Sequence, residues 1–363
     1  MIKNPPDYFF LSLILLLVVF GFVMLTSASS DLAKIRFGDS YYYLRHQLIY
    51  GLAIGIVGFL AGFFIYYRAW EKLSLVLLLL SLFLLVLVFT PLGLKIYGSE
   101  RWLNVFGVTV QPGELIKLSF LIYLSAWVSR SRIRGRSLKE GLLPFLFLIG
   151  IVSLLLIMQP STTTAVIIFG TSLLTYFTAG AKFKFLIASL FLCVLAFSLI
   201  VYFTPYRLER VMSFLNPDSD ELGKTYHINQ ALIAIGSGGI SGVGFGESTT
   251  KLKYLPEPIT DSIFAIIGEE TGFLGSLFLV LLFFVLVSRG LIIAKRAPDN
   301  FGRLLATSFI SLVGLQAFVN IGAISGLLPL TGVPLPFISY GGTALAVFLT
   351  MSGIMLNISR YRR

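Results

Sequence analysis

Asp261 stands where a long polar loop meets an apolar run, and its carboxylate is a candidate for acid–base chemistry. Two roles fit this position. An aspartate directly before a helix is a favoured N-cap residue, and a carboxylate that faces a cavity can act as a general base. Position alone does not decide between them, so both roles stay open at this point.

Four more charged residues lie within apolar runs, where an unpaired charge is costly. Glu114 and Lys117 are three positions apart and share a helix face. They can form a self-neutralising ion pair, the polar wall of a cavity, or both. Glu269 and Glu270 lie about 12 Å deeper than Asp261 if a helix begins there. Since two adjacent acids cannot face one direction, at least one should face a cavity or a partner helix, which leaves an ion relay and a transporter open.

Polar residues and prolines gather in six segments: Arg101-Trp102, Gln111–Lys117, Gln159–Thr164, Leu255–Asp261, Leu328–Phe337 and Ser339–Gly342. The prolines at 329, 334 and 336 cannot continue a regular helix. Backbone that is broken at membrane depth must line a cavity or be buried in protein. The fifth segment is therefore predicted to be a re-entrant or broken element, with a purely structural kink as the alternative.

The composition indicates the fold that positions these residues. Hydrophobic residues make up 56% of the chain and charged residues 12%, with a mean hydropathy of +0.90. Soluble domains average about 25% charged residues, so we predict an all-α, polytopic integral membrane protein with a single domain over residues 1–363. Runs of about 20 apolar residues mark the spans. The ten runs are 8–27, 47–66, 73–92, 113–129, 143–158, 163–179, 184–204, 264–288, 304–326 and 339–358.

Lys and Arg residues between the spans indicate the orientation, because cytoplasmic loops carry an excess of them. One side carries 17 basic and four acidic residues, whereas the other carries ten of each. The net charge of +11 is therefore an orientation signal, which argues against a nucleic-acid partner. Both termini are predicted to be cytoplasmic. All six polar segments and the large loop 205–263 then lie on the extracytoplasmic side.

Metal and disulfide chemistry have little support in the chain. There is one cysteine, Cys193, and the two histidines, His46 and His227, are far apart in sequence. These residues are too few for a Cys/His metal cluster, and a single cysteine cannot form an intrachain disulfide. We therefore expect no metal site.

Six stretches of the chain are recognisable in order: Arg101-Trp102, Gln111–Glu114 with Lys117, Ile235–Gly239, Tyr254–Glu257 with Thr260-Asp261, Gly268–Glu270, and Gly326–Gly342. Together they closely resemble the SEDS family (shape, elongation, division and sporulation), and the resemblance covers nearly the whole chain. Residues Ser40–Gln47 and Gln316–Gly322 are more similar to the division member FtsW than to the elongation member RodA.

The resemblance implies a peptidoglycan glycosyltransferase that polymerises lipid II at the outer face of the bacterial cytoplasmic membrane. Lipid II is a disaccharide-pentapeptide on an undecaprenyl diphosphate carrier. The family's essential aspartate aligns with Asp261, which is then expected to be the general base, with undecaprenyl diphosphate as the leaving group. A class B penicillin-binding protein, which is a transpeptidase, is the implied partner beside lipid II and membrane lipids. No cofactor is expected, although a divalent ion at the diphosphate stays open.

The resemblance and the polar segments together give the expected substrate-binding residues: Arg101, Glu114, Lys117, Gln159, Gln230, Ser237, Lys251, Lys253, Glu257, Thr260, Thr331, Pro334, Ser339, Tyr340 and Gly341. A leaving diphosphate needs positive charge or hydrogen-bond donors. Arg101 is expected to supply this charge, with Lys117, Lys251 or Lys253 as further candidates.

The chain departs from the family pattern at three positions. Ser161 replaces the usual aspartate after Gln-Pro, Ile259 replaces a frequent histidine before Thr-Asp, and Gly113 replaces serine. Two other functions stay open: a lipid II flippase, which Glu269 and Glu270 would suit, and a scaffold for the penicillin-binding protein. A flippase needs polar groups along a path through the membrane, so polar segments gathered outside favour the enzyme.

Overall fold

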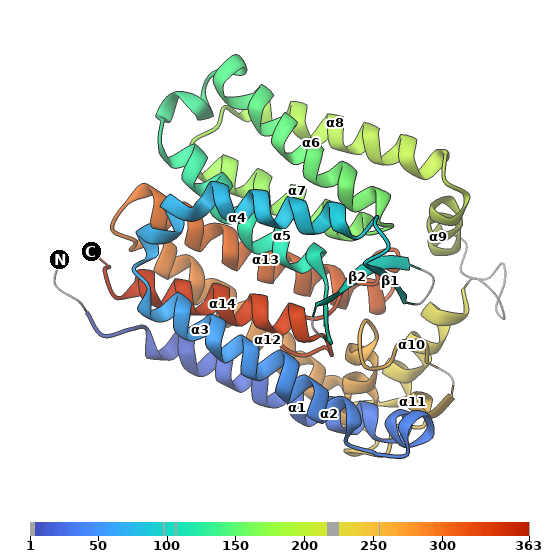
Figure 1. Ribbon diagram of the computed structural model, residues 1–363. Helices are drawn as coiled ribbons and strands as arrows, with labels where there is room; N and C mark the ends of the chain where they lie inside the picture. The colour runs from blue at the N-terminus through green and yellow to red at the C-terminus, as the bar shows by residue number, and fades with distance from the viewer. Residues whose placement is uncertain (1–3, 97–98, 106, 216–224, 254, 363) are drawn as a thin grey trace.

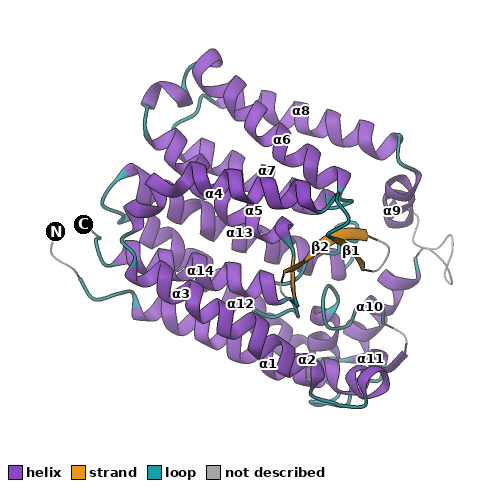
Figure 2. Ribbon diagram, viewed as in Figure 1, coloured by secondary structure: helices purple, strands orange, loops and turns teal. Residues whose placement is uncertain are grey.

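The computed structural model describes residues 4–362 except 97–98, 106, 216–224 and 254, and Figure 2 shows that they are mostly helical. The bundle consists of α1 (Tyr8–Phe37), α2 (Tyr42–His46), α3 (Ile54–Phe64), α4 (Tyr67–Leu87), α5 (Pro112–Ser129), α6 (Leu143–Met158), α7 (Thr162–Thr178), α8 (Phe183–Tyr202), α12 (Ile263–Lys295), α13 (Asn300–Ile324) and α14 (Gly342–Ser359). Three short helical pieces connect them: η1 (Gln47–Ala53) between α2 and α3, and η2 (Arg132–Gly135) with η3 (Leu138–Leu142) before α6. The long helices run along a common direction (Figure 1).

Within the described chain, eight helical segments are long and apolar enough to cross a membrane. α7 is apolar but has 17 residues, and α5 has 18 residues that include Glu114 and Lys117. With these two helices, the bundle matches the ten predicted spans. The predicted ends are close for most helices, whereas α1 and α12 extend ten and seven residues past their predicted ends at 27 and 288.

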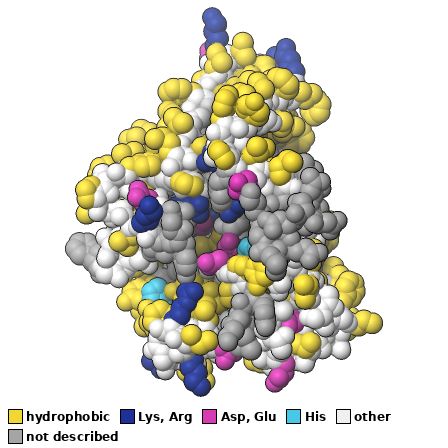
Figure 3. All heavy atoms as spheres, turned by 90° about the vertical axis from the view of Figure 1, so that its right-hand side faces the viewer, with side chains coloured by type: hydrophobic (Ala, Val, Ile, Leu, Met, Phe, Trp, Pro, Cys, Tyr) yellow, Lys and Arg dark blue, Asp and Glu magenta, His cyan; other side chains and the backbone are white. Residues whose placement is uncertain are grey.

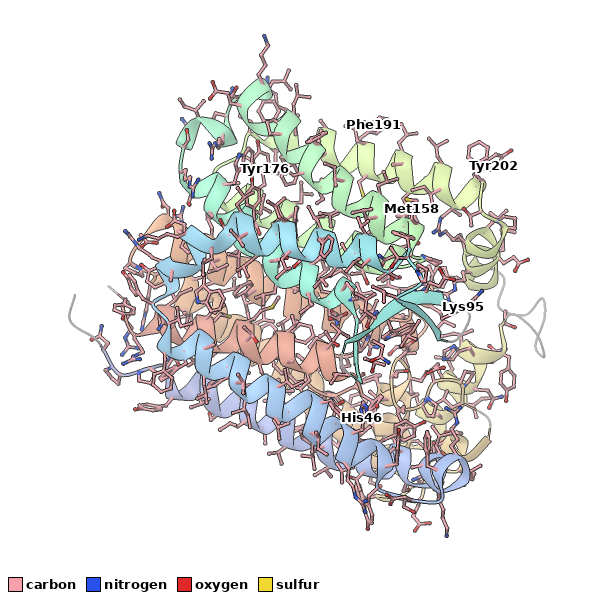
Figure 4. The ribbon with its side chains drawn as sticks, in the orientation of Figure 1. His46, Lys95, Met158, Tyr176, Phe191 and Tyr202 are labelled. Carbon is pink, nitrogen blue, oxygen red and sulfur yellow. The ribbon has the colours of Figure 1, made fainter. Side chains whose placement is uncertain are left out.

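Among the eight long apolar segments, α13 and α14 are the most buried. In their apolar windows, 67% and 78% of the residues are buried, against 17% in α8. α8 lies at the edge of the bundle, and Figure 4 shows Phe191 and Tyr202 pointing away from the other helices. Large apolar side chains are exposed along most of the spans, which suits a lipid environment because a soluble monomer rarely exposes such extended apolar surface.

The two chain termini lie at one end of the bundle (Figure 1). There the Asp7 carboxylate accepts the Phe10 N–H at 3.0 Å, which caps α1, and pairs with Arg289 of α12 at 2.8 Å. The opposite end holds the helices of the long loop, α9 (Pro205–Leu215), α10 (Tyr226–Ser237) and α11 (Thr250–Lys253), together with a small sheet. One end of the bundle therefore carries the termini. The opposite end carries α9, α10, α11 and the sheet and is called the elaborated end below.

The small sheet was not anticipated by the all-α prediction. Its strands β1 (Gly93–Ile96), β2 (Ser99–Val105) and β3 (Val108–Val110) are antiparallel in the order β1-β2-β3. Strands of four, seven and three residues are too short to give a clear alternating pattern in the sequence. The sheet carries Trp102 opposite Leu94 and brings Arg101 to the elaborated end.

The glycine-rich part of the loop packs into a break in α12. At Gly272 the backbone leaves the helix with φ 65° and ψ −162°. The loop replaces the lost helical partners through four backbone hydrogen bonds: Phe273 N–H to Gly239 O, Leu274 N–H to Ile240 O, Val243 N–H to Glu269 O, and Gly244 N–H to Glu270 O, at 2.9–3.1 Å. A Cβ on Gly242 would lie 2.1 Å from Glu270 O, so only glycine permits this approach. The first half of α12 is thereby oriented by the loop.

Candidate active site

At the elaborated end, the structure forms a cavity of about 350 Å³. Its walls come from α9, α10, the turn before α12, the end of α13 and the segment 325–341, which links α13 to α14. The polar lining residues are Glu209, Arg210, His227, Glu257, Asp261, Asn320 and Thr331, and the apolar ones include Phe214, Ile324 and Leu330. Figure 3 shows acidic and basic side chains around a hollow on this face, with a histidine beside them.

Asp261 lies at the cavity and outside α12, which begins at Ile263. The N-cap position is occupied by Ser262, whose side chain makes no capping hydrogen bond. The capping role considered for Asp261 is therefore not the one that it has in the structure. Gly332, in the left-handed region at φ 64°, faces it so closely that a Cβ there would lie 3.2 Å from Asp261 Oδ2. The Asp261 side chain is not used as a helix cap, and it borders the cavity.

The backbone around Asp261 is fixed by the segment 325–341. Asn320 Nδ2 donates to Asp261 O at 2.8 Å and to Val333 O at 2.7 Å. Ser339 Oγ donates to Thr260 O at 2.5 Å, and its oxygen accepts the Leu335 N–H at 2.8 Å. The segment has no regular helix between α13 and α14 and lines the cavity, which confirms the predicted broken element.

The electrostatic surroundings of Asp261 suit a base that works near neutral pH. The pKa of Asp261 is raised to about 6, mainly by burial and in addition by the Glu257 carboxylate. Arg210 and Arg101 lower the pKa and offset part of this effect. Glu257 itself borders the cavity with φ 48°, an uncommon backbone conformation for a residue with a Cβ, and accepts the Thr260 hydroxyl at 3.0 Å.

Two of the expected substrate residues connect the sheet to the turn between α6 and α7. The Arg101 guanidinium donates to Gln159 O at 3.0 Å and to Pro160 O at 2.5 Å. Gln159 Nε2 in turn donates to Leu85 O of α4 at 2.7 Å. Arg101 thus stands close enough to influence Asp261 while it holds β2 against the helices.

Glu114 and Lys117 form the ion pair that their spacing predicts, at 2.6 Å and almost completely buried. Lys117 Nζ also donates to Gln316 Oε1 at 2.8 Å, and Gln316 Nε2 donates to Pro334 O at 2.8 Å. This chain of contacts leads from α5 through α13 to the cavity segment. It favours support of the segment over direct contact with substrate.

Lys251 has all three of its N–H donors occupied inside the protein. Its Nζ contacts Gly246 O at 2.7 Å, Glu270 Oε1 at 2.9 Å and Ser27 Oγ at 3.1 Å. An ammonium group has three donors, so this geometry favours holding the loop against α1 and α12 over binding a diphosphate.

Both acids of α12 make contacts to the loop, although Glu270 Oε2 is buried without a hydrogen-bond partner among the described residues. Glu269 accepts the Ser248 hydroxyl at 2.5 Å and the Thr249 N–H at 3.0 Å, and Glu270 is paired with Lys251. An ion relay through these two carboxylates therefore has no support in the geometry.

The remaining expected residues differ in where they lie relative to the cavity. Thr331 lines the cavity, and its carbonyl accepts the Thr163 hydroxyl at 2.9 Å. The Gly341 N–H donates to Gln47 Oε1 at 3.0 Å, and the Tyr340 hydroxyl contacts Nδ1 of His46, labelled in Figure 4, at 2.8 Å. Gln230 and Ser237 lie on α10, outside the cavity lining. Lys253 lies in α11, and its side chain is outside the described residues.

Sequence reasoning missed His227, Asn320 and Arg210. His227 Nε2 lies 2.7 Å from Ser262 Oγ, and burial lowers the pKa of His227 to about 4, with Arg210 as a further cause. Asn320 stood within a recognised family stretch, but no signal showed that it reaches Asp261, which is 59 positions away. In the described chain, no group of three or more His, Cys, Asp or Glu side chains could hold a metal ion.

Fold and site together define a helical, multi-pass membrane protein with an acidic cavity at the end opposite its termini. The profile of the FtsW/RodA/SpoVE cell cycle proteins matches residues 7–363, and the chain belongs to this family. It is 38% identical to stage V sporulation protein E of Bacillus subtilis, over 99% of both chains. It is 39% identical to the probable peptidoglycan glycosyltransferase FtsW of Trichlorobacter lovleyi, over 97% of this chain and 93% of that protein.

Solved structures show the same architecture. A chain from a structure on the coordination of polymerization and crosslinking by a peptidoglycan synthase complex has a TM-score of 0.81 and 28% identity, with 98% of each chain covered. The rod shape determining protein RodA of Thermus thermophilus has a TM-score of 0.72 and 27% identity, over 99% of this chain and 98% of that chain.

The buried pair of Lys251 and Glu270 generates a stability prediction. Lys251→Met leaves the Glu270 carboxylate buried without its cation, and we expect a loss of about 3 kcal/mol in unfolding free energy. The double variant Lys251→Met, Glu270→Leu removes both charges and should recover most of the loss. Thermal unfolding of the detergent-solubilised protein measures both. If the single variant Lys251→Met were as stable as the wild type, the stabilising role of the Lys251–Glu270 ion pair would be contradicted.

Proposed function

We propose that this protein is a peptidoglycan glycosyltransferase that polymerises lipid II into glycan strands at the outer face of the bacterial cytoplasmic membrane. The observation that carries the proposal is the Asp261 carboxylate. It borders a cavity at one end of the helical bundle, and its pKa is about 6. The 39% identity to a protein named as a probable peptidoglycan glycosyltransferase supports the same activity.

Asp261 acts as the general base of the reaction. An acceptor sugar hydroxyl is a weak nucleophile, and a carboxylate within hydrogen-bond reach takes its proton during attack. The hydroxyl oxygen forms a bond to the anomeric carbon of the donor lipid II. The bond from that carbon to the diphosphate breaks, and undecaprenyl diphosphate leaves with the electron pair. Arg210 and Arg101, which both influence Asp261, supply positive charge on the side of the leaving group.

The position of the cavity suits a lipid-linked substrate. The carrier's tail must stay in the bilayer while its sugars lie in water, so the catalytic groups must stand at the membrane boundary. With the termini in the cytoplasm, as the basic loops indicate, the cavity at the opposite end faces the extracytoplasmic side (Figure 1). The family members FtsW and stage V sporulation protein E, at 39% and 38% identity, favour a role in division or sporulation over elongation.

The partner of the enzyme is a transpeptidase of the class B penicillin-binding proteins. Support comes from the similar chain in a peptidoglycan synthase complex that couples polymerization to crosslinking. A flippase is the main alternative function, and its best sequence support was the pair Glu269 and Glu270. Because the loop contacts both carboxylates, the geometry favours the enzyme.

Asp261→Ala should abolish glycan polymerisation, because it removes the carboxylate that takes the hydroxyl proton. The measurement is polymerisation of labelled lipid II by the purified protein together with its transpeptidase. Movement of fluorescent lipid II between leaflets of proteoliposomes is measured on the same samples. Equal glycan product from the variant would remove Asp261 as the base, and lipid flipping by a protein that makes no polymer would favour the transporter.

The raised pKa of Asp261 predicts the pH dependence of polymerisation. The base works only when ionised, so the rate should be half-maximal near pH 6 and fall about tenfold for each further pH unit below it. Glu257→Gln removes a neighbouring negative charge and should shift the midpoint to lower pH, whereas Arg210→Gln should shift it to higher pH. Initial rates between about pH 5 and 8 test this. A midpoint that moves with neither variant would contradict the assignment.

A further inference from the structure

His227 lies in the wall of the cavity but has no part in the mechanism so far. It stands on α10, and its Nε2 is 2.7 Å from the hydroxyl of Ser262, the residue directly after Asp261. That contact is the one hydrogen bond that the imidazole side chain makes to other described residues. The second ring nitrogen, Nδ1, is therefore left for a ligand.

The hydrogen bonds of Ser262 determine which nitrogen carries the proton. Ser262 Oγ is 2.9 Å from Pro256 O, and a carbonyl oxygen can only accept. The single hydroxyl proton of Ser262 is used there, so Ser262 must accept from His227, and Nε2 carries the N–H. Since burial keeps the imidazole neutral, Nδ1 offers a lone pair and no proton.

Asn320 adds a second acceptor to the same wall. Its Nδ2 lies near two carbonyl oxygens, Asp261 O and Val333 O, which fixes the orientation of the amide. Its Oδ1 is buried and has no hydrogen-bond partner among the described residues. A buried acceptor without a donor is costly, so a ligand or water that donates a hydrogen bond to Asn320 Oδ1 would be stabilised there.

These atoms select the kind of ligand that the wall can bind. Asp261, Glu257, His227 Nδ1 and Asn320 Oδ1 all accept hydrogen bonds. A sugar offers hydroxyl and amide donors to such a wall, whereas a diphosphate offers only acceptor oxygens and negative charge. The positive charge of the cavity comes from Arg210 on α9, a different wall.

We propose that His227, supported by Asn320, binds the acceptor sugar: Nδ1 accepts a hydrogen bond from one of its hydroxyl or amide groups and holds the sugar beside Asp261. The proposal rests on the glycosyltransferase function above. It divides the cavity into an acceptor side, at α10 and the end of α13, and a diphosphate side towards the arginines.

The kinetic test separates the two substrates. Lipid II with its acceptor hydroxyl methylated serves only as donor, and a short glycan strand serves as acceptor. His227→Phe, which keeps a ring but has no nitrogen, should raise the KM for the acceptor about tenfold and leave the donor KM within about twofold. His227→Gln keeps one donor for Ser262 and one acceptor for the sugar, so it should stay near the wild type. Asn229→Ala, on the same helix but outside the cavity lining, is the control.

Each result bears on a separate claim. Polymer from the wild type tests the proposed function, and its absence would overturn that function and this inference with it. With an active wild type, an unchanged acceptor KM in His227→Phe, or an equal rise for donor and acceptor, would overturn the inference alone.

A second measurement keeps the histidine at position 227, so it does not depend on the folding of a His227 variant. The chain has two histidines, so ¹⁵N-histidine labelling gives two imidazole spin systems, which His46→Gln assigns. We expect the Nε2–H tautomer for His227, and a shift of its Nδ1 resonance when the lipid-free disaccharide-pentapeptide is added. A proton on Nδ1, or a shift with inorganic pyrophosphate and none with the sugar, would overturn the proposal.

Discussion

The side-chain amide of Asn320 donates to two backbone carbonyls, that of Asp261 before α12 and that of Val333 in the segment 325–341. This bridge joins the two irregular pieces of backbone that form the site. Val333 is buried in the protein, where a carbonyl without a donor is costly. The amide at the end of α13 satisfies both pieces at once and so ties the Asp261 turn to the segment that lines the cavity.

The rest of the elaborated end supports this bridge. Lys117 and Gln316 extend it inward from Pro334 to α5, and Ser339 extends it to Thr260. On the other side, the glycine-rich loop completes α12 at Gly272 and so sets the direction of the half-helix that follows Asp261. Charged groups inside the bundle therefore serve mainly to fix irregular backbone, whereas the Asp261 carboxylate borders the cavity.

The spans were predictable because long apolar runs and basic loops are local features of the sequence. Glu114 and Lys117 were predictable for the same reason, since three positions fix a shared helix face. The sheet was missed because its strands are short. The contacts of Lys251 were not predicted because its partners, Ser27 and Glu270, lie 224 and 19 positions away. Nothing in the sequence indicated the position of His227, because it depends on a contact with Ser262, which is 35 positions away. Contacts of this kind are decided by packing, which local pattern does not encode.

The central step of the proposed reaction is the transfer of the acceptor hydroxyl proton to the carboxylate at position 261. Chemical rescue tests this proton transfer directly. The rate of glycan formation by Asp261→Gly is measured on unmodified lipid II, with and without added formate. A small carboxylate can enter the space that the side chain leaves and act as the base. We predict no polymer from the folded variant alone and a formate-dependent return of part of the rate. Polymerisation by Asp261→Gly at the wild-type rate without formate would contradict the account.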